Sequence, residues 1–375
     1  MAKIDIGQRI KEVMNQLKNW ALTLVCVFVL LSCKQQGGVM STLLLTVDYT
    51  DGSEVVLSDY VDDVSVVALE TDDDCLIGDV SKVQLFNGVI YVLDMRSNTL
   101  YAFDSAGGYV NKLYRVGQGP GEYLSLTDFE VTGDGVYVLD ISTHKIICHG
   151  YDFRLLSEVK FNTLGSSFMM ADDGYWLYNE YSGSGDDFQL SYNKAGELIE
   201  RHFPRQTEPN KNYYMASSNV FQKSGGTLYF SPRFGNTIYK AEADSWLPVY
   251  ELSFADKTYT SEMTISDDDV IENRYIFRRN FYILNSYVVV DYMFNRMRYF
   301  VFCDKAAGAV QSGAVHNDLI AGYERFFPRW SSGNSLIESV EAENVINEFP
   351  TLITYGALDG YKIDDNPLLV IYKFK

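Results

Sequence analysis

The arginines in the last third of the sequence are interleaved with aromatic residues and are the side chains best suited to binding a ligand. Eight of the fourteen arginines lie between residues 233 and 329, although the whole chain has 31 basic and 50 acidic residues and a net charge of −19. A guanidinium group binds a carboxylate through paired hydrogen bonds, and an aromatic face stacks on a sugar or a cation. We therefore predict an acidic or glycan-like ligand that is bound by Arg233, Arg278, Arg279, Arg296, Arg329, Tyr292 and Trp330. The plainer alternative is a set of surface arginines that pair with neighbouring carboxylates.

Residues that could support catalysis or metal binding form no convincing pattern. The four histidines are scattered along the chain: His144, His149, His202 and His316. Two aspartate runs, 72–74 and 267–269, lack the alternating order of a calcium-binding loop. We predict a solvated turn for the first run and, for the second, the start of a short helix that leads toward Ile276. No catalytic residue, metal or cofactor is predicted.

The cysteines indicate no covalent framework. Cys75, Cys148 and Cys303 remain once the N-terminal segment is set aside, and they are odd in number and widely separated. This spacing fits neither disulfides nor zinc, so we interpret them as small buried hydrophobic residues.

The glycine-rich segment Gly117–Gly121 invites comparison with a phosphate-binding loop. Glu122 stands where the third glycine of such a motif belongs, and a strand rather than a helix is expected next. We therefore predict a crossover between two sheets, in which glycines permit positive φ angles.

The N-terminus is typical of an export signal. Basic residues precede the apolar run Ala21–Leu31, which is shorter than the roughly 20 residues that span a bilayer. Leu30-Leu31-Ser32-Cys33 then resembles the lipobox of bacterial lipoproteins, whose cysteine is acylated and becomes the first mature residue. The resemblance implies a signal peptide over residues 1–33, lipid on Cys33 and a flexible tether over residues 34–42, with Met1 or Met14 as the start. We expect a lipid anchor in the cell envelope, in its outer membrane, with the periplasmic or surface face left open.

Composition indicates a large folded core and excludes one class of partner. Hydrophobic residues make up 47% of the chain and aromatic residues 14%, which is enough to bury a sizeable core. The strong negative charge would repel a phosphate backbone over most of the surface, so we expect no nucleic-acid partner.

A repeat of nearly fifty residues organises the rest of the chain. Gly88–Asp94 returns as Gly135–Asp140, and Gly226–Phe230 continues the same series. Further copies fall at Asp173–Tyr178, Tyr287–Asp291 and, in degraded form, Ser335–Val340. Short strands repeated at this period predict an all-β, six-bladed β-propeller with four-stranded antiparallel blades, in one domain over residues 43–375. For closure of the ring we expect residues 43–47, 64–70 and 368–372 to share one blade.

Five segments strengthen this interpretation: Val67–Thr71, Ile77–Gly78, Tyr91–Asp94, Gly117–Tyr123 and Asn366–Tyr372. Together they resemble the six-bladed, NHL-like propeller lipoproteins of gut anaerobic Gram-negative bacteria. The resemblance covers roughly residues 43–375 and implies a fold rather than an activity, because most members of that family have no assigned function.

We therefore predict an extracytoplasmic binding protein whose ligand, an acidic or glycan-like molecule or a protein partner, occupies the axial mouth of the propeller. One alternative is an enzyme that acts on carbohydrate or peptide at the axis, and it predicts convergent histidines or carboxylates there. A second alternative is a scaffold of an outer-membrane complex, and it predicts a broad apolar patch on the outer blade edges.

Overall fold

A computed structural model of the chain describes residues 42–49, 53–179, 188–204, 219–233, 235–242, 245–258, 276 and 278–375. Residues Leu43–Lys375 form a compact unit. The predicted signal peptide with Cys33, nearly all of the tether, the aspartate run 267–269 and the helix expected after it lie outside the described residues.

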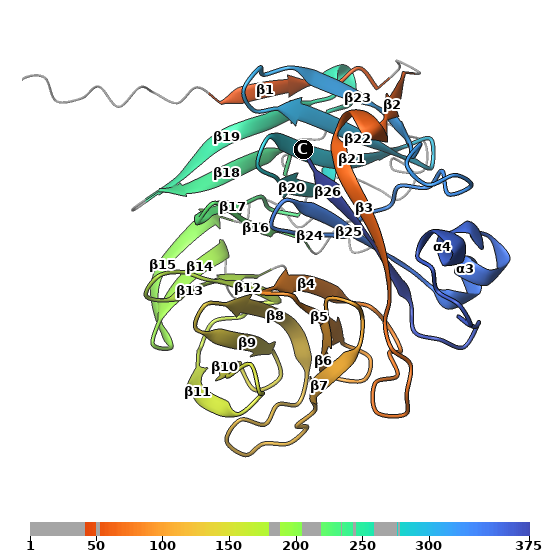
Figure 1. Cartoon of the computed structure of the whole chain (residues 1–375). Helices are drawn as coiled ribbons and strands as arrows, with labels where there is room; N and C mark the ends of the chain where they lie inside the picture. Colours follow the sequence, from red (N-terminus) through yellow and green to blue (C-terminus); the bar gives the residue numbers. More distant parts are fainter. Residues whose placement is uncertain are drawn as a thin grey trace, which may run out of the picture. The chain divides into compact units, whose positions relative to one another are not determined.

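Six sheets surround a common axis in this unit, which confirms the predicted six-bladed β-propeller (Figure 1). Each blade has four antiparallel strands, which are ordered from the axis outward along the chain in blades 1 to 5. Blade 1 consists of β4 (Lys82–Phe86), β5 (Val89–Asp94), β6 (Thr99–Asp104) and β7 (Tyr109–Leu113), and blade 2 of β8 (Leu126–Thr132), β9 (Gly135–Asp140), β10 (Lys145–His149) and β11 (Leu155–Lys160). Blade 3 consists of β12 (Ser167–Met170), β13 (Tyr175–Tyr178), β14 (Phe188–Lys194) and β15 (Glu197–Pro204), and blade 4 of β16 (Phe221–Ser224), β17 (Thr227–Phe230), β18 (Thr237–Glu242) and β19 (Ser245–Ser253).

Blades 5 and 6 complete the ring. Blade 5 consists of β20 (Arg278–Ile283), β21 (Tyr287–Phe294), β22 (Met297–Asp304) and β23 (Val310–His316), and blade 6 of β24 (Trp330–Ser332), β25 (Ser335–Val340), β26 (Leu368–Phe374) and the N-terminal strand β3 (Val61–Ala68). Two short helices, α3 (Ala342–Asn347) and α4 (Thr351–Tyr355), lie in the connection between β25 and β26. The 3-10 turn η1 (Leu57–Asp59) follows β2 (Glu54–Val56), and η2 (Ala255–Lys257) follows β19. The hydrophobic core lies largely between neighbouring blades, as where Leu93 of β5 and Phe129 of β8 belong to one cluster.

The aspartate that ends the repeated Tyr-Val-Leu-Asp strand is a structural cap. Asp94 is fully buried, and its carboxylate accepts hydrogen bonds from the backbone N–H groups of Gly78 (2.8 Å) and Arg96 (2.9 Å). Asp140 accepts equivalent bonds from Leu124 and Ser142, both at 2.9 Å. A buried carboxylate needs such donors, and each of these two aspartates joins the loop that enters its blade to the turn that follows its second strand. The repeated aspartate therefore has a structural role in the blades.

The ring closes in blade 6, where chain segments from the two ends of the described unit pair. β26 pairs antiparallel with β3, and Leu369 lies opposite Val67, which confirms the prediction for residues 64–70 and 368–372. We call this junction of β3 and β26 the seam, and Asn366 stabilises it. The Asn366 side chain accepts a hydrogen bond from Ile77 N–H (2.8 Å) and donates to the carbonyl oxygens of Glu70 (2.6 Å) and Cys75 (2.7 Å).

The expectation that residues 43–47 share this blade is wrong. β1 (Leu43–Thr46) pairs in parallel with β19 at the outer edge of blade 4, and β2 (Glu54–Val56) pairs in parallel with β23 at the outer edge of blade 5. The outermost strand of a blade exposes unpaired backbone groups, so an incoming strand can add to it without joining the seam. Blades 4 and 5 consequently have five strands.

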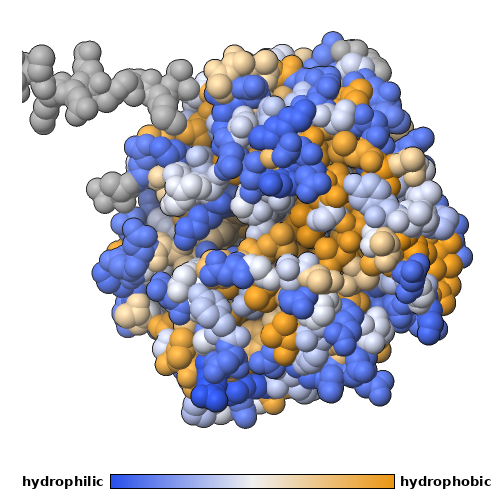
Figure 2. Space-filling model, in the orientation of Figure 1, coloured by the Kyte–Doolittle hydropathy of each residue, from blue (hydrophilic) through white to orange (hydrophobic). Residues whose placement is uncertain are grey.

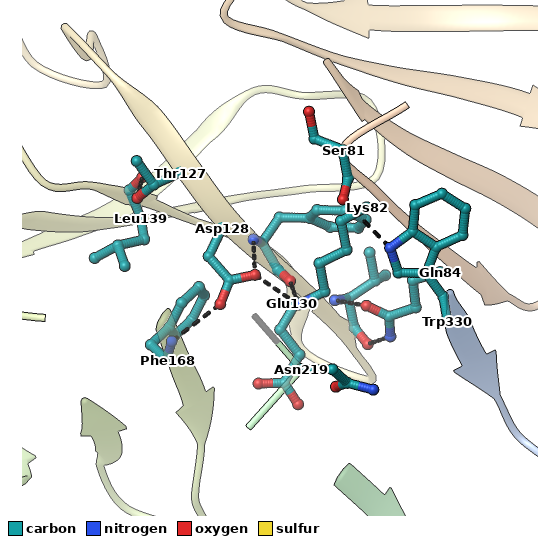
Figure 3. A network of polar contacts seen from close by, with 12 residues as sticks. Ser81, Lys82, Gln84, Thr127, Asp128, Glu130, Leu139, Phe168, Asn219 and Trp330 are labelled. Atoms are coloured by element: carbon teal, nitrogen blue, oxygen red, sulfur yellow. Dashed lines mark hydrogen bonds and ion pairs between the residues drawn. The ribbon is translucent and has the colours of Figure 1, made fainter. Parts of the chain in front are cut away.

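Near the axis, side chains connect the inner strands of neighbouring blades through hydrogen bonds (Figure 3). Gln84 of β4 exchanges two hydrogen bonds with the backbone of Val131 in β8, at 2.7 and 2.9 Å. Lys82 Nζ donates to Asp128 Oδ1 (2.6 Å) and to the Phe129 carbonyl (2.7 Å), and Asp128 Oδ2 accepts from Phe168 N–H of β12 (3.0 Å). These bonds satisfy backbone groups that the free inner edge of each sheet would otherwise leave unpaired.

The crossover predicted at Gly117–Gly121 lies between β7 and β8 and so joins blades 1 and 2. Gly121 has a φ of 72°, and Gly119 N–H donates to Glu122 Oε2 at 2.7 Å. A Cβ atom on Gly117 would lie 2.1 Å from the same oxygen. The first glycine therefore makes room for Glu122, and only the last needs the left-handed backbone.

Candidate functional site

Strand order places the predicted arginines at one end of the propeller axis. The inner strand of a blade begins where its second strand ends, because the two are antiparallel, and rotation about the axis repeats this arrangement in each blade. Arg279 is the second residue of β20, and Arg329 immediately precedes β24. Arg233 lies between β17 and β18, and Arg296 between β21 and β22. We call this end of the ring, built by blades 4 to 6, the arginine end.

Arg278 is used within the protein at this end. It is 1% exposed, and its Nε donates to Ser231 Oγ at 2.9 Å. Nη2 donates to the carbonyl oxygens of Ser231 (2.9 Å) and Pro232 (2.7 Å), and Nη1 to that of Arg279 (2.8 Å). Burial lowers the pKa of Arg278 to about 10, which leaves it charged at neutral pH. Arg278 thus joins blade 5 to the turn after β17, and its guanidinium donors are directed at protein oxygens.

Tyr292 and Trp330 are also buried and act as packing surfaces. Tyr292 is 1% exposed and stacks on Tyr299 with ring centroids 5.5 Å apart. Trp330 donates from Nε1 to the Ser81 carbonyl (3.3 Å), and its ring supports the guanidinium carbon of Arg329 at 4.6 Å. Arg296 is exposed in a hairpin turn with a φ of 62°. Of the predicted residues, Arg233 and Arg279 are partly exposed, and Arg296 and Arg329 are exposed.

Arg298 also lies at this end, although it is not among the predicted ligand-binding residues. Its Nε lies 2.7 Å from Asp291 Oδ2, and the two side chains are 6% and 0% exposed. Nη2 donates to the Pro328 carbonyl at 2.7 Å, and the guanidinium carbon lies 4.1 Å from the ring centroid of Phe327. Nη1 is buried and has no hydrogen-bond partner. A buried charged nitrogen without a partner is costly, so an acceptor brought to Nη1 would stabilise Arg298.

The register of the β21–β22 hairpin brings Asp291 and Arg298 together. Asp291 lies opposite Phe300 in the β21–β22 ladder, so Arg298 is its diagonal neighbour on the same face of the sheet. A two-residue turn at residues 295–296 produces this register. The pair could therefore be predicted from the sequence once the turn is placed at these two residues.

Arg279, Arg298 and Arg329 form a group of three guanidinium groups, which we call the arginine cluster. Burial lowers the pKa of Arg279; Asp291 opposes this shift, whereas the charges of Arg298 and Arg329 add to it. Burial also lowers the pKa of Arg329, and Arg298 again adds to the shift. Burial acts on Arg298 in the same direction, but Asp291 outweighs it and holds the pKa of Arg298 above its ordinary value. The three positive charges therefore repel one another, and Asp291 contacts the cluster directly through Arg298.

The axis also carries a buried carboxylate with a perturbed pKa. Glu130 is 6% exposed; burial raises its pKa, although Met170 N–H donates to Oε2 at 2.6 Å and Lys223 Nζ lies 3.8 Å from Oε1. The enzyme alternative predicts a group of this kind. These contacts join β8 to β12 and to β16, however, so the geometry by itself gives Glu130 a structural role.

The histidines do not converge. His149 is fully buried at the end of β10. Burial lowers its pKa to about 4, so the ring is neutral near pH 7. Within the described residues, no group of three or more His, Cys, Asp or Glu side chains could hold a metal ion. Cys75, Cys148 and Cys303 are buried and free, as predicted, and the run 72–74 is an exposed turn.

Exposed hydrophobic residues are the surface feature that the scaffold alternative predicts. Figure 2 shows hydrophobic residues gathered over the region of β3, β25 and β26 on one face, with hydrophilic residues scattered around the rim. On the outer part of blades 1 and 2, Val110, Tyr114 and Leu156 are 57%, 59% and 59% exposed. In the described part of the chain, no helix is long and apolar enough to cross a bilayer.

Comparison with solved structures supports the fold. A candidate exported protein from Bacteroides fragilis is 20% identical, with a TM-score of 0.71 over 89% of this chain and 100% of that one. A member of the DUF4221 family from Bacteroides vulgatus is 10% identical, with a TM-score of 0.54 over 84% of this chain and 97% of that one. At these identities the likeness shows the propeller fold alone. No curated protein matches the chain.

The family follows from a match over most of the chain. Residues 41–373 fit the profile described as a domain of unknown function, DUF4934. This range includes all six blades and both ends of the seam. The chain, itself a six-bladed β-propeller, therefore belongs to the DUF4934 family.

Proposed function

We propose that this protein is an extracytoplasmic, lipid-anchored binding protein that holds an acidic ligand at the arginine end of its propeller. The observation that carries the proposal is the arginine cluster, in which Arg298 Nη1 is buried without a partner and Arg298 Nε bonds to Asp291. A carboxylate or sulfate on a ligand would supply the missing acceptor and reduce the repulsion among the guanidinium groups.

The accessible members of the cluster support this choice. Arg279 is partly exposed, and Arg329 is exposed with its guanidinium stacked on Trp330. A stacked guanidinium is held in one orientation, so less conformational freedom is lost when it binds. Arg278 supports the site from within, because its Nη1 donates to the Arg279 carbonyl.

A thermal-shift screen of acidic oligosaccharides and small dicarboxylates tests the proposal. We expect at least one such compound to raise the melting temperature of the wild-type protein, and Arg279→Gln and Arg329→Gln each to reduce that rise at least severalfold. Arg154→Gln is the matched control, because Arg154 is an arginine on blade 2 whose side chain is 85% exposed. Retention of the full shift by both cluster variants would contradict the proposal.

The anchor has a separate test. Ser32-Cys33 follows the apolar run of the export signal, and an acyl chain contributes about 0.8 kcal/mol for each buried methylene. We expect the wild-type protein in the membrane fraction and Cys33→Ser in the soluble fraction after cell lysis. Membrane retention of the variant would contradict acylation at this residue and would leave the ligand site untouched.

A further inference from the structure

The arginine end carries two carboxylates beside its guanidinium groups. Asp79 lies in the loop that enters blade 1, three residues before β4, and Glu341 directly follows β25. Both belong to the same end of the axis as Arg329, because inner strands begin there and second strands end there. Asp79, Glu341 and Arg329 are all exposed.

A continuous series of contacts links the two signs of charge. Arg298 Nη2 donates to the Pro328 carbonyl, one residue before Arg329. Arg329 stacks on Trp330, and Trp330 Nε1 donates to the carbonyl of Ser81. Ser81 Oγ in turn donates to Asp79 Oδ2 at 2.7 Å. The positive and negative groups are therefore fixed on adjoining parts of one surface.

These carboxylates act on Arg329 without forming an ion pair with it. The charges of Asp79 and Glu341 oppose the lowering of the Arg329 pKa, and after burial, Asp79 is the largest influence raising the pKa of Glu341. Within the described residues, however, no ion pair of 4.0 Å or less joins Arg329 to either carboxylate. Asp79 and Glu341 therefore keep negative charge beside Arg329 that no direct ion pair with Arg329 cancels.

From this geometry we propose that the ligand of the arginine end is an amine-bearing acid, such as a free amino acid or an amino acid derivative. Its acidic group contacts Arg279, Arg298 and Arg329, and its ammonium group contacts Asp79 and Glu341. A ligand with an acidic group alone would meet Asp79 and Glu341 as like charges, whereas a zwitterion satisfies both parts of the surface. The inference rests on the proposed function and deepens it.

Isothermal titration with matched probes tests the inference. γ-Aminobutyrate, butyrate and butylamine differ only in which charged groups they carry, and phosphoethanolamine against inorganic phosphate repeats the comparison for a phosphorylated acid. We expect each zwitterion to bind the wild-type protein at least tenfold more tightly than the matching acid, and the amine alone to bind more weakly than the zwitterion.

The variant Asp79→Asn/Glu341→Gln separates this inference from the proposed function. We expect it to lose the preference for zwitterions while it keeps or gains affinity for the acid alone, because the repulsion is removed. Asp359→Asn is the control, as another acidic residue at an exposed position. Arginine-dependent binding of acids with no preference for the amine would overturn the inference and leave the proposed function standing. Failure of every probe to bind would overturn the inference, and the separate screen of acidic oligosaccharides would then decide the proposed function.

Discussion

Arg298 and Asp291 form a buried ion pair on neighbouring strands of blade 5, with Arg298 Nε 2.7 Å from Asp291 Oδ2. Asp291 Oδ1 also accepts a hydrogen bond from Asn280 N–H of the inner strand at 2.9 Å. The pair therefore fixes Arg298 at the arginine end, where its Nη1 is buried without a hydrogen-bond partner. The same carboxylate shapes both the blade and the candidate site.

Removal of the negative partner should destabilise the protein strongly. We expect Asp291→Asn to lower the free energy of unfolding by about 3 to 5 kcal/mol, because it leaves the guanidinium of Arg298 buried without a counter-charge. Urea unfolding followed by circular dichroism measures the change. Asp152→Asn, which removes the partner of Arg154 from a pair with side chains 58% and 85% exposed, should cost less than about 1 kcal/mol. A loss below 1 kcal/mol for Asp291→Asn as well would argue against the buried pair.

Glu130 should make stability fall as pH rises on the acidic side of neutrality. Its pKa in the folded protein is raised, so the folded state binds the proton more tightly than the unfolded state between the ordinary glutamate pKa and the folded one. Its contribution is greatest below the ordinary pKa and declines as pH rises through the folded pKa. We expect Glu130→Gln to remove this part of the pH dependence and to match or exceed wild-type stability near pH 7, because the amide oxygen can still accept from Met170 N–H.

Melting temperatures of the two proteins across pH 4 to 8 provide the test. Glu242→Gln is the control, because this glutamate has a side chain that is 45% exposed. A strong loss of stability in Glu130→Gln at pH 7, with parallel pH profiles, would show that the charged form is needed at this position.

His149 should have the opposite effect on acid stability. Its folded pKa of about 4 is below the ordinary value of 6.5, so the unfolded state takes up a proton first as pH falls. Stability is therefore lost between pH 6.5 and 4, by up to about 3 kcal/mol at about 1.4 kcal/mol for each pH unit. We expect His149→Phe to flatten this part of the unfolding profile relative to His316→Gln, whose histidine side chain is 38% exposed. An unchanged acid limb in His149→Phe would refute the assignment.

Gly107 should be intolerant of any side chain. It has a φ of 91°, and a Cβ atom there would lie 1.9 Å from the Ala68 carbonyl oxygen at the end of the seam strand β3. We expect Gly107→Ala to lower the free energy of unfolding by more than about 2 kcal/mol. The new Cβ atom would force the backbone at Ala68 to move, and residue 107 would also keep a strained positive φ. Gly88→Ala, with a φ of 79° and nothing within 4 Å, should cost about 1 kcal/mol in the same thermal unfolding assay. Equal losses would mean that the seam does not constrain residue 107.

The sequence by itself determined the number of blades, because each copy of the repeat supplies one second strand. Tyr91 and Tyr137 lie at matching positions in β5 and β9, and the copy inferred at Asp173–Tyr178 contains β13. It also predicted that β3 and β26 share the closing blade, although it assigned residues 43–47 to that blade as well. These features depend on local alternation and spacing, which are visible in one dimension.

Only the tertiary structure decided which arginine is buried and which is accessible. Arg278 and Arg279 are adjacent in the sequence, yet the ladder irregularity between Arg278 and Phe281 accompanies burial of the first and partial exposure of the second. The position of β1 on blade 4 was likewise undetermined, because any outer edge offers the same backbone donors and acceptors. Register and the packing of one blade on the next depend on residues far apart in the chain, so residue spacing alone does not specify them.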